Sequence, residues 1–247
     1  MRIAVISDIH GNDFAFEKVE ADIKKQGADQ IVCLGDAVQG GAQPAEVVQR
    51  LGRLNCPVVM GNADDWLITG VDSGREAIPP ERLKKMDAIR EWSLSQLTED
   101  DLKFMKGFQP TVTINLESDL DLLCFHGSPT DFDDVIRNIT PEDEFQKFLS
   151  AYNKNILAGG HTHAQQVRRN GEFFFFNPGS VGFAYSAYQP NGKFKADAWA
   201  EYAILSVKNG EIDLQFHRLP FDANHLIEIY RKSGRPFAED AIAQYQQ

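Results

Sequence analysis

The sequence predicts an α/β fold with a parallel sheet at its centre and helices between the strands. Three short apolar runs, at 3–6, 31–34 and 57–60, are typical of strands that are buried on both faces. A helix-forming stretch with short links separates each run from the next. Each run also ends in polar residues, at the edge where ligands collect in sheets of this kind. Together these three observations favour a βαβαβ core over an all-helical or all-β fold.

The first run leads into a loop, Ser-Asp-Ile-His-Gly-Asn, and then into a predicted helix. Asn12 or Asp13 can cap the start of this helix, and Gly27 suits its end. Its apolar positions fall on one face: Phe14, Phe16, Val19 and Ile23. This face of the helix is therefore expected to point inward.

The second run ends in Gly35-Asp36, and the third ends in Gly61-Asn62. Between them, Pro44 is a good first residue for a helix that continues to about Leu54. The three strand ends therefore carry polar side chains: Asp8 with His10, then Asp36, then Asn62.

From about 65 to 108 the pattern changes to helices. One is expected over 80–97, and Thr98-Glu99-Asp100-Asp101 can cap a second. Trp66 and Trp92 lie in this stretch, which we interpret as a helical insertion in a single domain spanning 1–247. It serves either as a lid over the site or as additional packing.

Beyond the insertion, further strands are expected at 111–116 and 121–125, with a turn at 117–119, and the second strand leads to His126. Thr140 and Pro141 are a start signal for a helix to about Tyr152. The next apolar run, 155–159, leads to Gly160-His161-Thr162-His163.

The remainder reads as antiparallel. Two hairpins are expected, 165–168 with 173–176 around Asn170-Gly171, and 198–207 with 211–217 around 208–210. A glycine-rich loop at 177–182 separates them, and two short helices end the chain.

The composition of the chain argues against several classes of protein. The formal net charge of −11 and the lack of a basic tract argue against nonspecific nucleic-acid binding. No apolar run approaches the roughly 20 residues that span a bilayer, and the N-terminus does not resemble a signal peptide. Three cysteines without CxxC spacing do not form a disulfide framework. A cytoplasmic protein is therefore expected.

The polar residues at the strand ends form one candidate metal site. In extended backbone His161 and His163 point to the same side, and Gly159 and Gly160 let the backbone pass close by. The full set is Asp8, His10, Asp36, Asn62, His126, His161 and His163. It exceeds the needs of one tetrahedral zinc but suits two divalent ions, with Asp36 as the natural bridge. Nitrogen and oxygen donors fit manganese, our first expectation, and also iron, zinc, cobalt or nickel.

These motifs resemble those of the calcineurin-like metallophosphoesterases. The resemblance rests on Asp-x-His, Gly-Asp, Gly-Asn-x-Asp and Gly-His-Thr-His in that order, and it covers most of residues 1–182. The small, single-domain phosphodiesterase branch is the most similar. The resemblance implies a two-sheet βαβαβ sandwich flanked by helices.

It also implies a division of the ligands. Asp8, His10, Asp36 and His163 would hold one ion, and Asp36, Asn62, His126 and His161 the other. Two ions about 3.5–4 Å apart would turn a bridging water into hydroxide at neutral pH, which attacks phosphorus in line. Asn62 and His126 would also contact the substrate, and Ser180 with the backbone of 177–182 is a further candidate. A tight turn is the alternative role for that loop.

One departure from the family pattern bears on the substrate. Many members carry histidine at the position of Ala63, where it is thought to protonate the leaving group. Because a general acid is typically worth about 10²–10⁴-fold in rate, its loss favours phosphodiesters or esters with good leaving groups. Asp64 or Asp65 could act as the acid, although either could instead cap the helix at Trp66.

Other functions stay open. The same site could serve a phosphomonoesterase or nucleotide phosphatase, or the fold could persist as a noncatalytic scaffold, which the intact ligand set disfavours. A nuclease is disfavoured by the absence of a basic surface. The expected partner is a small phosphorylated substrate, with neither membrane nor nucleic acid, and the sequence does not fix the oligomeric state.

Overall fold

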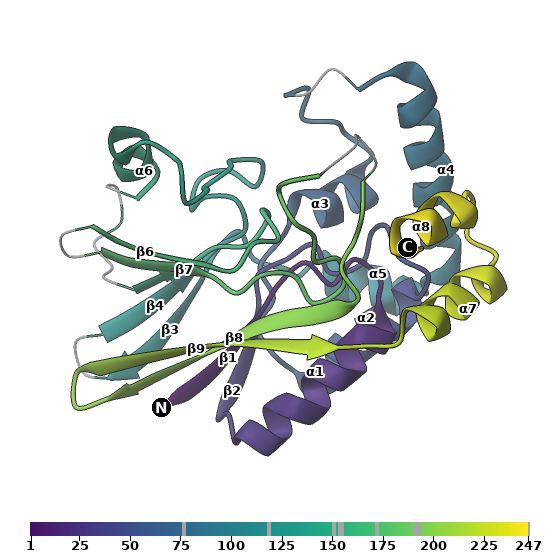
Figure 1. The fold of residues 1–247 in the computed structure, drawn as a ribbon. Helices are drawn as coiled ribbons and strands as arrows, with labels where there is room; N and C mark the ends of the chain where they lie inside the picture. The colour runs from purple at the N-terminus through teal and green to yellow at the C-terminus, as the bar shows by residue number, and fades with distance from the viewer. Residues whose placement is uncertain are drawn as a thin grey trace.

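Two β-sheets pack face to face with helices on their outer sides, as Figure 1 shows. The computed structural model describes residues 1–75, 78–117, 120–149, 152, 156–170, 173–189 and 194–246. The first sheet has the order β2-β1-β8-β9 and the second the order β3-β4-β5-β7-β6. This arrangement confirms the expected two-sheet α/β class.

The bounds of the elements follow. The first sheet contains β1 (Arg2–Ile6), β2 (Gln30–Cys33), β8 (Trp199–Lys208) and β9 (Glu211–Pro220). The second contains β3 (Val112–Glu117), β4 (Leu120–Cys124), β5 (Ile156–Ala158), β6 (Gln166–Asn170) and β7 (Phe173–Asn177). The helices are α1 (Asp13–Gln26), α2 (Pro44–Leu54), α3 (Asn62–Thr69), α4 (Pro80–Gln96), α5 (Glu99–Met105), α6 (Glu142–Leu149), α7 (Ala223–Ser233) and α8 (Ala238–Tyr245).

The strand β1 is apolar from Ile3 to Ile6 because both of its faces are buried. In β1, Ile3 and Val5 face the second sheet, while Ala4 and Ile6 pack in the cluster that contains the helices α1 and α2. On the other side, Phe145 of α6 covers the outer face of the second sheet. The order of layers is therefore helix, sheet, sheet, helix.

Local sequence signals predicted the starts of the helices α1, α2 and α5 correctly. Asn12 caps α1, since its side chain accepts a hydrogen bond from the Ala15 amide, and Gly27 ends the helix in the left-handed conformation. Pro44 is the first residue of α2, and Thr98 and Asp101 form the expected capping box of α5.

The expected third parallel strand is wrong. Residues 57–60 form only isolated bridges, between Val58 and Cys33 and between Val59 and Gln109. Pro57 has no N–H to donate, which shortens the ladder that this run can make with β2. The neighbour of β1 on its other side is β8, which runs antiparallel to it, so the sheet is mixed rather than parallel.

The expected cap at Asp64 or Asp65 is also wrong. The helix α3 begins earlier, at Asn62 directly after the bridge residues, and its N-cap is Gly61. The expected turns at 118–119 and at Gly171 lie outside the described residues, as do 150–151 in the expected continuation of α6 to Tyr152. No helix among the described residues has the length and apolar character to cross a membrane.

Candidate metal centre

The seven residues of the predicted site converge where strands of both sheets end. Asp8 follows β1 and Asp36 follows β2, while His126 follows β4 and the pair His161 and His163 follows β5. The carboxyl ends of these parallel strands lie on one side of the sandwich, so residues far apart in sequence become neighbours.

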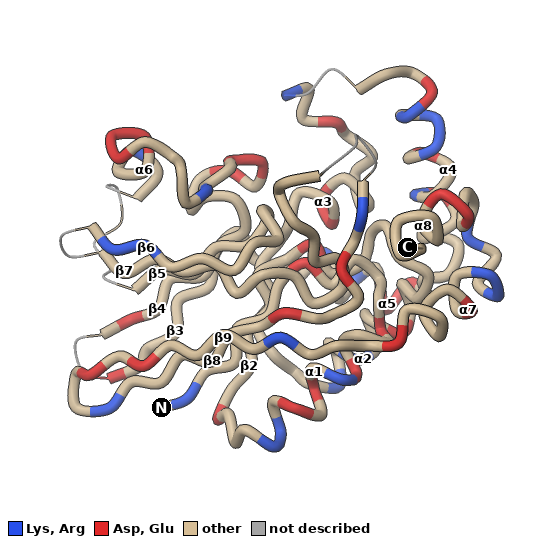
Figure 2. The backbone as a smooth tube through the Cα atoms, viewed as in Figure 1, with Lys and Arg blue, Asp and Glu red and all other residues tan. Residues whose placement is uncertain are grey.

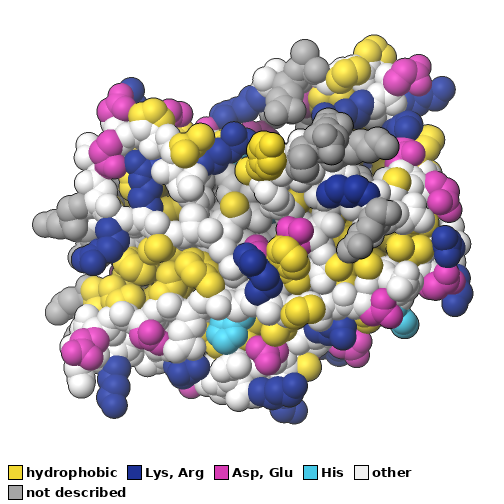
Figure 3. Space-filling model, viewed as in Figure 1, with side chains coloured by type: hydrophobic (Ala, Val, Ile, Leu, Met, Phe, Trp, Pro, Cys, Tyr) yellow, Lys and Arg dark blue, Asp and Glu magenta, His cyan; other side chains and the backbone are white. Residues whose placement is uncertain are grey.

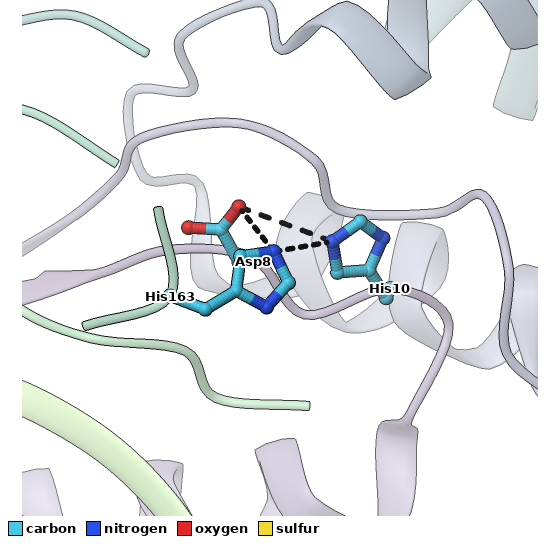
Figure 4. Close-up of side chains that lie close together, drawn as sticks. All are labelled: Asp8, His10 and His163. Carbon is cyan, nitrogen blue, oxygen red and sulfur yellow. Dashed lines mark hydrogen bonds and ion pairs between the residues drawn. The ribbon is translucent and has the colours of Figure 1, made fainter. Parts of the chain in front are cut away.

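The first group consists of Asp8, His10 and His163, whose side chains point toward one another in Figure 4. The Nε2 atoms of His10 and His163 lie 3.1 Å apart. Asp8 Oδ1 lies 3.2 Å from His163 Nε2 and 3.9 Å from His10 Nε2. Three donor atoms therefore face one small volume, as a shared cation requires.

The second group consists of Asp36, His126 and His161, whose donor atoms all lie within 4.8 Å of one another. Asn62 extends it, because its Oδ1 atom lies 3.0 Å from His126 Nε2. His126 is completely buried. The structure thus brings together both of the predicted ligand groups.

Asp36 lies between the two groups. Its Oδ2 atom is 3.7 Å from His10 Nε2 in the first group and 3.4 Å from His126 Nε2 in the second. Its other oxygen, Oδ1, accepts a hydrogen bond from the Ala63 amide at 2.8 Å. One oxygen of Asp36 is thus fixed by the backbone while the other faces both candidate metal positions.

Strained backbone marks these residues. Among the described residues, eight that are not glycine have positive φ, and five of them belong to the site: Asp8, His10, Asp36, His161 and His163. Left-handed backbone at residues other than glycine is unfavourable, and it persists where the surrounding structure enforces it, often at functional sites. The fold therefore holds these side chains in place against a local preference for another conformation.

Three histidines are oriented by backbone carbonyls. The Nδ1 atoms of His10, His126 and His163 lie 2.9, 2.8 and 2.5 Å from the carbonyls of Gln39, Leu34 and Phe183. A carbonyl can only accept, so each Nδ1 carries the hydrogen and, in the neutral ring, each Nε2 presents its lone pair to the site. Metal-binding histidines are held in this way by their outer partners.

The carboxylate of Asp8 is also oriented by hydrogen bonds, which reach only one of its two oxygens. Its Oδ2 atom accepts hydrogen bonds from the Ser7 hydroxyl at 2.6 Å and from the His161 amide at 3.2 Å. Within the described part of the chain, the buried Oδ1 atom has no hydrogen-bond partner. A buried carboxylate oxygen without a donor is costly, and a cation would satisfy it.

Gly160 and Gly182 lie where two segments of the chain approach each other too closely for a side chain. A Cβ at Gly160 would lie 2.2 Å from Ser7 Oγ, and one at Gly182 would lie 1.7 Å from the Ile9 carbonyl. The Gly182 amide in turn donates to the Asp8 carbonyl at 3.1 Å. The loop at 177–182 thus packs directly beneath the loop that carries Asp8 and His10.

Ser180 takes part in the same packing. It is completely buried, and its hydroxyl donates to the Asp8 carbonyl and accepts from the Phe183 amide. The hydroxyl therefore positions the Asp8 loop, and contact between Ser180 and a substrate stays a prediction.

The charges of the site are coupled. Burial alone would raise the pKa of Asp36, but the charge of His126 and its hydrogen bond lower that pKa below its ordinary value. Burial would lower the pKa of His126, yet Asp36 raises it to about 9. Burial and the neighbouring His126 lower the pKa of His161 to about 4. A metal ion at this position would take the place of the proton on His126.

The sequence missed the role of Asp64. Its carboxylate is completely buried and accepts hydrogen bonds from the amides of Ala37 and Val38, at 3.0 and 3.1 Å. Burial, with a further contribution from Asp36, raises the pKa of Asp64 to about 7. Asp64 therefore fixes the loop after Asp36, which its place in the sequence motif does not reveal.

The donor set fits divalent metal ions. It combines buried carboxylates with imidazoles whose Nε2 atoms face inward, it leaves one buried oxygen without a partner, and it contains no thiolate. The residues that could hold the ions are Asp8, His10 and His163 on one side, His126, His161 and Asn62 on the other, and Asp36 between them.

Comparisons with known proteins agree with this geometry. Residues 1–210 match the family model for the calcineurin-like phosphoesterase superfamily domain. An uncharacterised protein of Methanocaldococcus jannaschii is 28% identical over 95% of this chain and 93% of its own length. The phosphodiesterase YfcE of Escherichia coli is 28% identical over 73% of this chain and 79% of its own length.

A solved structure shows the same fold across the whole chain. The metallophosphoesterase from Sphaerobacter thermophilus superposes with a TM-score of 0.71 at 24% identity, covering 98% of each chain.

Proposed function

The chain belongs to the calcineurin-like phosphoesterase superfamily, and on that premise we propose that it hydrolyses a phosphodiester or an activated phosphate ester at two divalent metal ions. The position of Asp36 carries the proposal, because one carboxylate oxygen faces both His10 and His126. The relative from Escherichia coli that bears the name phosphodiesterase supports the choice of a diester.

Each ion would have its own ligands. Asp8, His10 and His163 hold the first and Asn62, His126 and His161 the second, with Asp36 shared between them. When bound, the ions supply a water of lowered pKa and neutralise charge on the phosphoryl oxygens. Manganese is the first candidate, and iron, zinc, cobalt and nickel fit the same donors.

The side chains of this protein position the substrate rather than attack it. The Asn62 amide and His126 lie side by side and are the groups we assign to contact the phosphoryl oxygens. Burial raises the pKa of the thiols of Cys33 and Cys124, so neither is a competent nucleophile. The chain therefore relies on orientation and charge, not on covalent catalysis.

The leaving group is the second element of the proposal. At position 63 the chain contributes only a backbone amide, which donates to Asp36 Oδ1. An alanine side chain cannot protonate a departing alkoxide, so we propose a preference for leaving groups that depart without a proton.

The first experiment compares bis(p-nitrophenyl) phosphate with p-nitrophenyl phosphate, each with Mn²⁺ and with chelator. We expect hydrolysis of the diester that chelator abolishes, and much slower hydrolysis of a dialkyl phosphate, from which only an alkoxide can leave. Cleavage of the monoester alone would replace this proposal with a phosphomonoesterase. Equal rates for aryl and alkyl leaving groups would remove the argument from Ala63.

The matched variant is Asp36→Asn, which keeps the size of the side chain and loses its charge. We expect metal content to fall and activity to drop by at least about 10²-fold, because the shared ligand serves both ions. Metal bound to the native protein without activity on either ester would indicate a narrow natural substrate, whereas inactivity without bound metal would favour a scaffold of the same fold.

A further inference from the structure

A cavity of about 490 Å³ opens beside the first ligand group, and His10 and His163 form part of its wall. The other walls come from α4, from the chain after Gly182 and from the C-terminal helices α7 and α8. Its volume falls within the range of about 300–1,000 Å³ that is usual for small-molecule sites. The helix α4 belongs to the stretch that the sequence identified as a lid or as packing, and here it lines the cavity.

The cavity is basic although the protein is acidic. Among the described residues that line it are three cations, Arg82, Lys85 and Arg235, and one carboxylate, Asp240. Figure 2 places lysine and arginine along α4 where it approaches α8, whereas the charged residues of α8 itself are acidic, and Figure 3 shows the same face with side chains. For a chain of net charge −11, such an excess of positive charge at one place favours anionic ligands.

The three cations are not equivalent. Arg235 is used by the fold, since it donates to the carbonyls of Gly40, Pro236 and Phe237. Lys85 pairs with Asp240 at 2.6 Å, but both side chains are about half exposed. Arg82 lies at an exposed position of α4, and its guanidinium makes no hydrogen bond or ion pair with any residue that the structure describes. Arg82 is thus available for a ligand.

Two aromatic side chains are exposed in the same cavity. Phe194 is 39% exposed and stacks on Phe183, while Phe237 is 42% exposed and carries Lys85 over its ring. Phe237 also has a φ of 56°, which is unfavourable for a bulky residue. Strained backbone that presents an apolar ring to a cavity is a feature of binding sites.

We propose that this cavity binds the part of the substrate distant from the reacting phosphorus, and that this part is a planar ring bearing a second negative charge. The planar group contacts Phe194 and Phe237, and Arg82, assisted by Lys85, meets the charge. This assignment rests on the proposed function, because it uses the first metal position next to His10 as the place of the reacting phosphate. Nucleotides with a further phosphate are the chemical class that fits.

Binding measurements test whether Arg82 contacts a second negative charge on the ligand. Adenosine 3′,5′-bisphosphate and adenosine 5′-phosphate are titrated into the Mn²⁺-loaded protein, and calorimetry gives both dissociation constants. We expect the native protein to prefer the bisphosphate, and Arg82→Gln to weaken bisphosphate binding about tenfold while weakening monophosphate binding less than twofold. The control Lys84→Gln changes a cation of α4 two positions further along, which is exposed and does not line the cavity, and should leave both constants unchanged.

A second pair of variants tests the ring. Phe194→Leu should weaken both nucleotides, because the aromatic surface is lost, and should leave inorganic pyrophosphate binding unchanged. Tyr188→Leu is the control, since Tyr188 is 79% exposed and lies outside the cavity. Equal effects of the two substitutions would contradict a ring-binding wall.

The outcomes separate this inference from the proposed function. If the native protein cleaves bis(p-nitrophenyl) phosphate with Mn²⁺ but binds both nucleotides equally, the subsite is wrong and the proposed function stands. If no ester is cleaved but Arg82→Gln and Lys84→Gln differ as expected, the cavity binds such ligands and the proposed reaction is wrong.

Discussion

At the scale of single residues, positive φ angles and short carbonyl contacts define the site more sharply than residue type does. Asn55 and Asn209 also have left-handed backbone, but Asn55 ends α2 and Asn209 lies in the turn between β8 and β9, where such residues are common. Of the five residues with positive φ in the candidate metal centre, His10 also lies in a turn, which a hydrogen bond from the Asn12 amide to the Ile9 carbonyl closes. The other four lie in the loops that follow strands. Their strain is maintained by hydrogen bonds from outside, such as that from Ser180 to Asp8.

Gly160→Ala tests the close approach behind Asp8. The new Cβ would lie 2.2 Å from Ser7 Oγ and 3.2 Å from Asp8 Oδ2, so the hydrogen bond that orients Asp8 would break. We expect the free energy of unfolding to fall by about 1–3 kcal/mol, and metal content and activity to fall with it. Chemical denaturation and elemental analysis measure these two quantities.

The control is Gly52→Ala in α2, where nothing lies within 4 Å of the added Cβ. This change should stabilise the protein by about 0.5–1 kcal/mol, because alanine favours the helix, and should leave metal content unchanged. If both substitutions lowered metal content alike, the argument from close approach at Gly160 would be wrong.

Sequence patterns can identify a functional residue without identifying the residues that it contacts in the fold. The polar residues at strand ends indicated one set of donors, the family resemblance implied its division into two groups, and the structure brings residues of each group together. Asp64 was missed, because an acidic residue after Gly-Asn is also what a helix cap looks like. Its contacts are with Ala37 and Val38, about 27 positions away, and only the folded chain makes them neighbours.

At the scale of elements, Arg50 joins the first two helices. Its guanidinium, only 14% exposed, donates to both carboxylate oxygens of Asp13 and to Glu20. The helix α1 begins at Asp13, shortly after His10, and Asn12 is its N-cap. The contact of Arg50 with Asp13 therefore anchors the chain next to the candidate site.

Arg50→Lys keeps the charge but loses the planar fork that matches Asp13. We expect the free energy of unfolding to fall by on the order of 1–2 kcal/mol, after allowance for the partly exposed Glu20. Arg53→Lys, at an exposed position of the same helix, should change it by less than about 0.5 kcal/mol. The midpoints of denaturant unfolding measure both effects. Equal shifts of the midpoint in the two variants would refute the special role of Arg50.

The starts of α1, α2 and α5 were predictable because their signals are local, as Asn12, Pro44 and Thr98 show. The start of α3 at Asn62 was not. The run at 57–60 was not, because whether an apolar run forms a strand depends on the ladder that its neighbours offer. Here Pro57 lacks a donor, and the Met60 amide bonds to Gln109 rather than to β2.

At the scale of the whole molecule, the candidate metal centre lies between the two sheets. Asp8 and Asp36 follow strands of the first sheet, and His126, His161 and His163 follow strands of the second. Ions that bind only the folded chain therefore stabilise the packing of one sheet against the other.

Mn²⁺ should accordingly raise the melting temperature. At about 100 times the dissociation constant the stabilisation is about 2.7 kcal/mol, which corresponds to a rise of roughly 5–10 °C for a chain of this size. Scanning calorimetry with and without chelator measures the rise. The variant Asp36→Asn should show little of it, and an undiminished rise in that variant would place the ions elsewhere.

By itself the sequence determined the α/β class, the capped helices and the types of ligand, because helix caps, buried strands and donor chemistry are each encoded in a few neighbouring residues. Only the tertiary structure decided that β8 lies beside β1, that the sheets are mixed, and that Arg82 on α4 shares a cavity with His10. These features depend on contacts between segments up to two hundred residues apart, whose formation is governed by packing of the whole chain rather than by local preference.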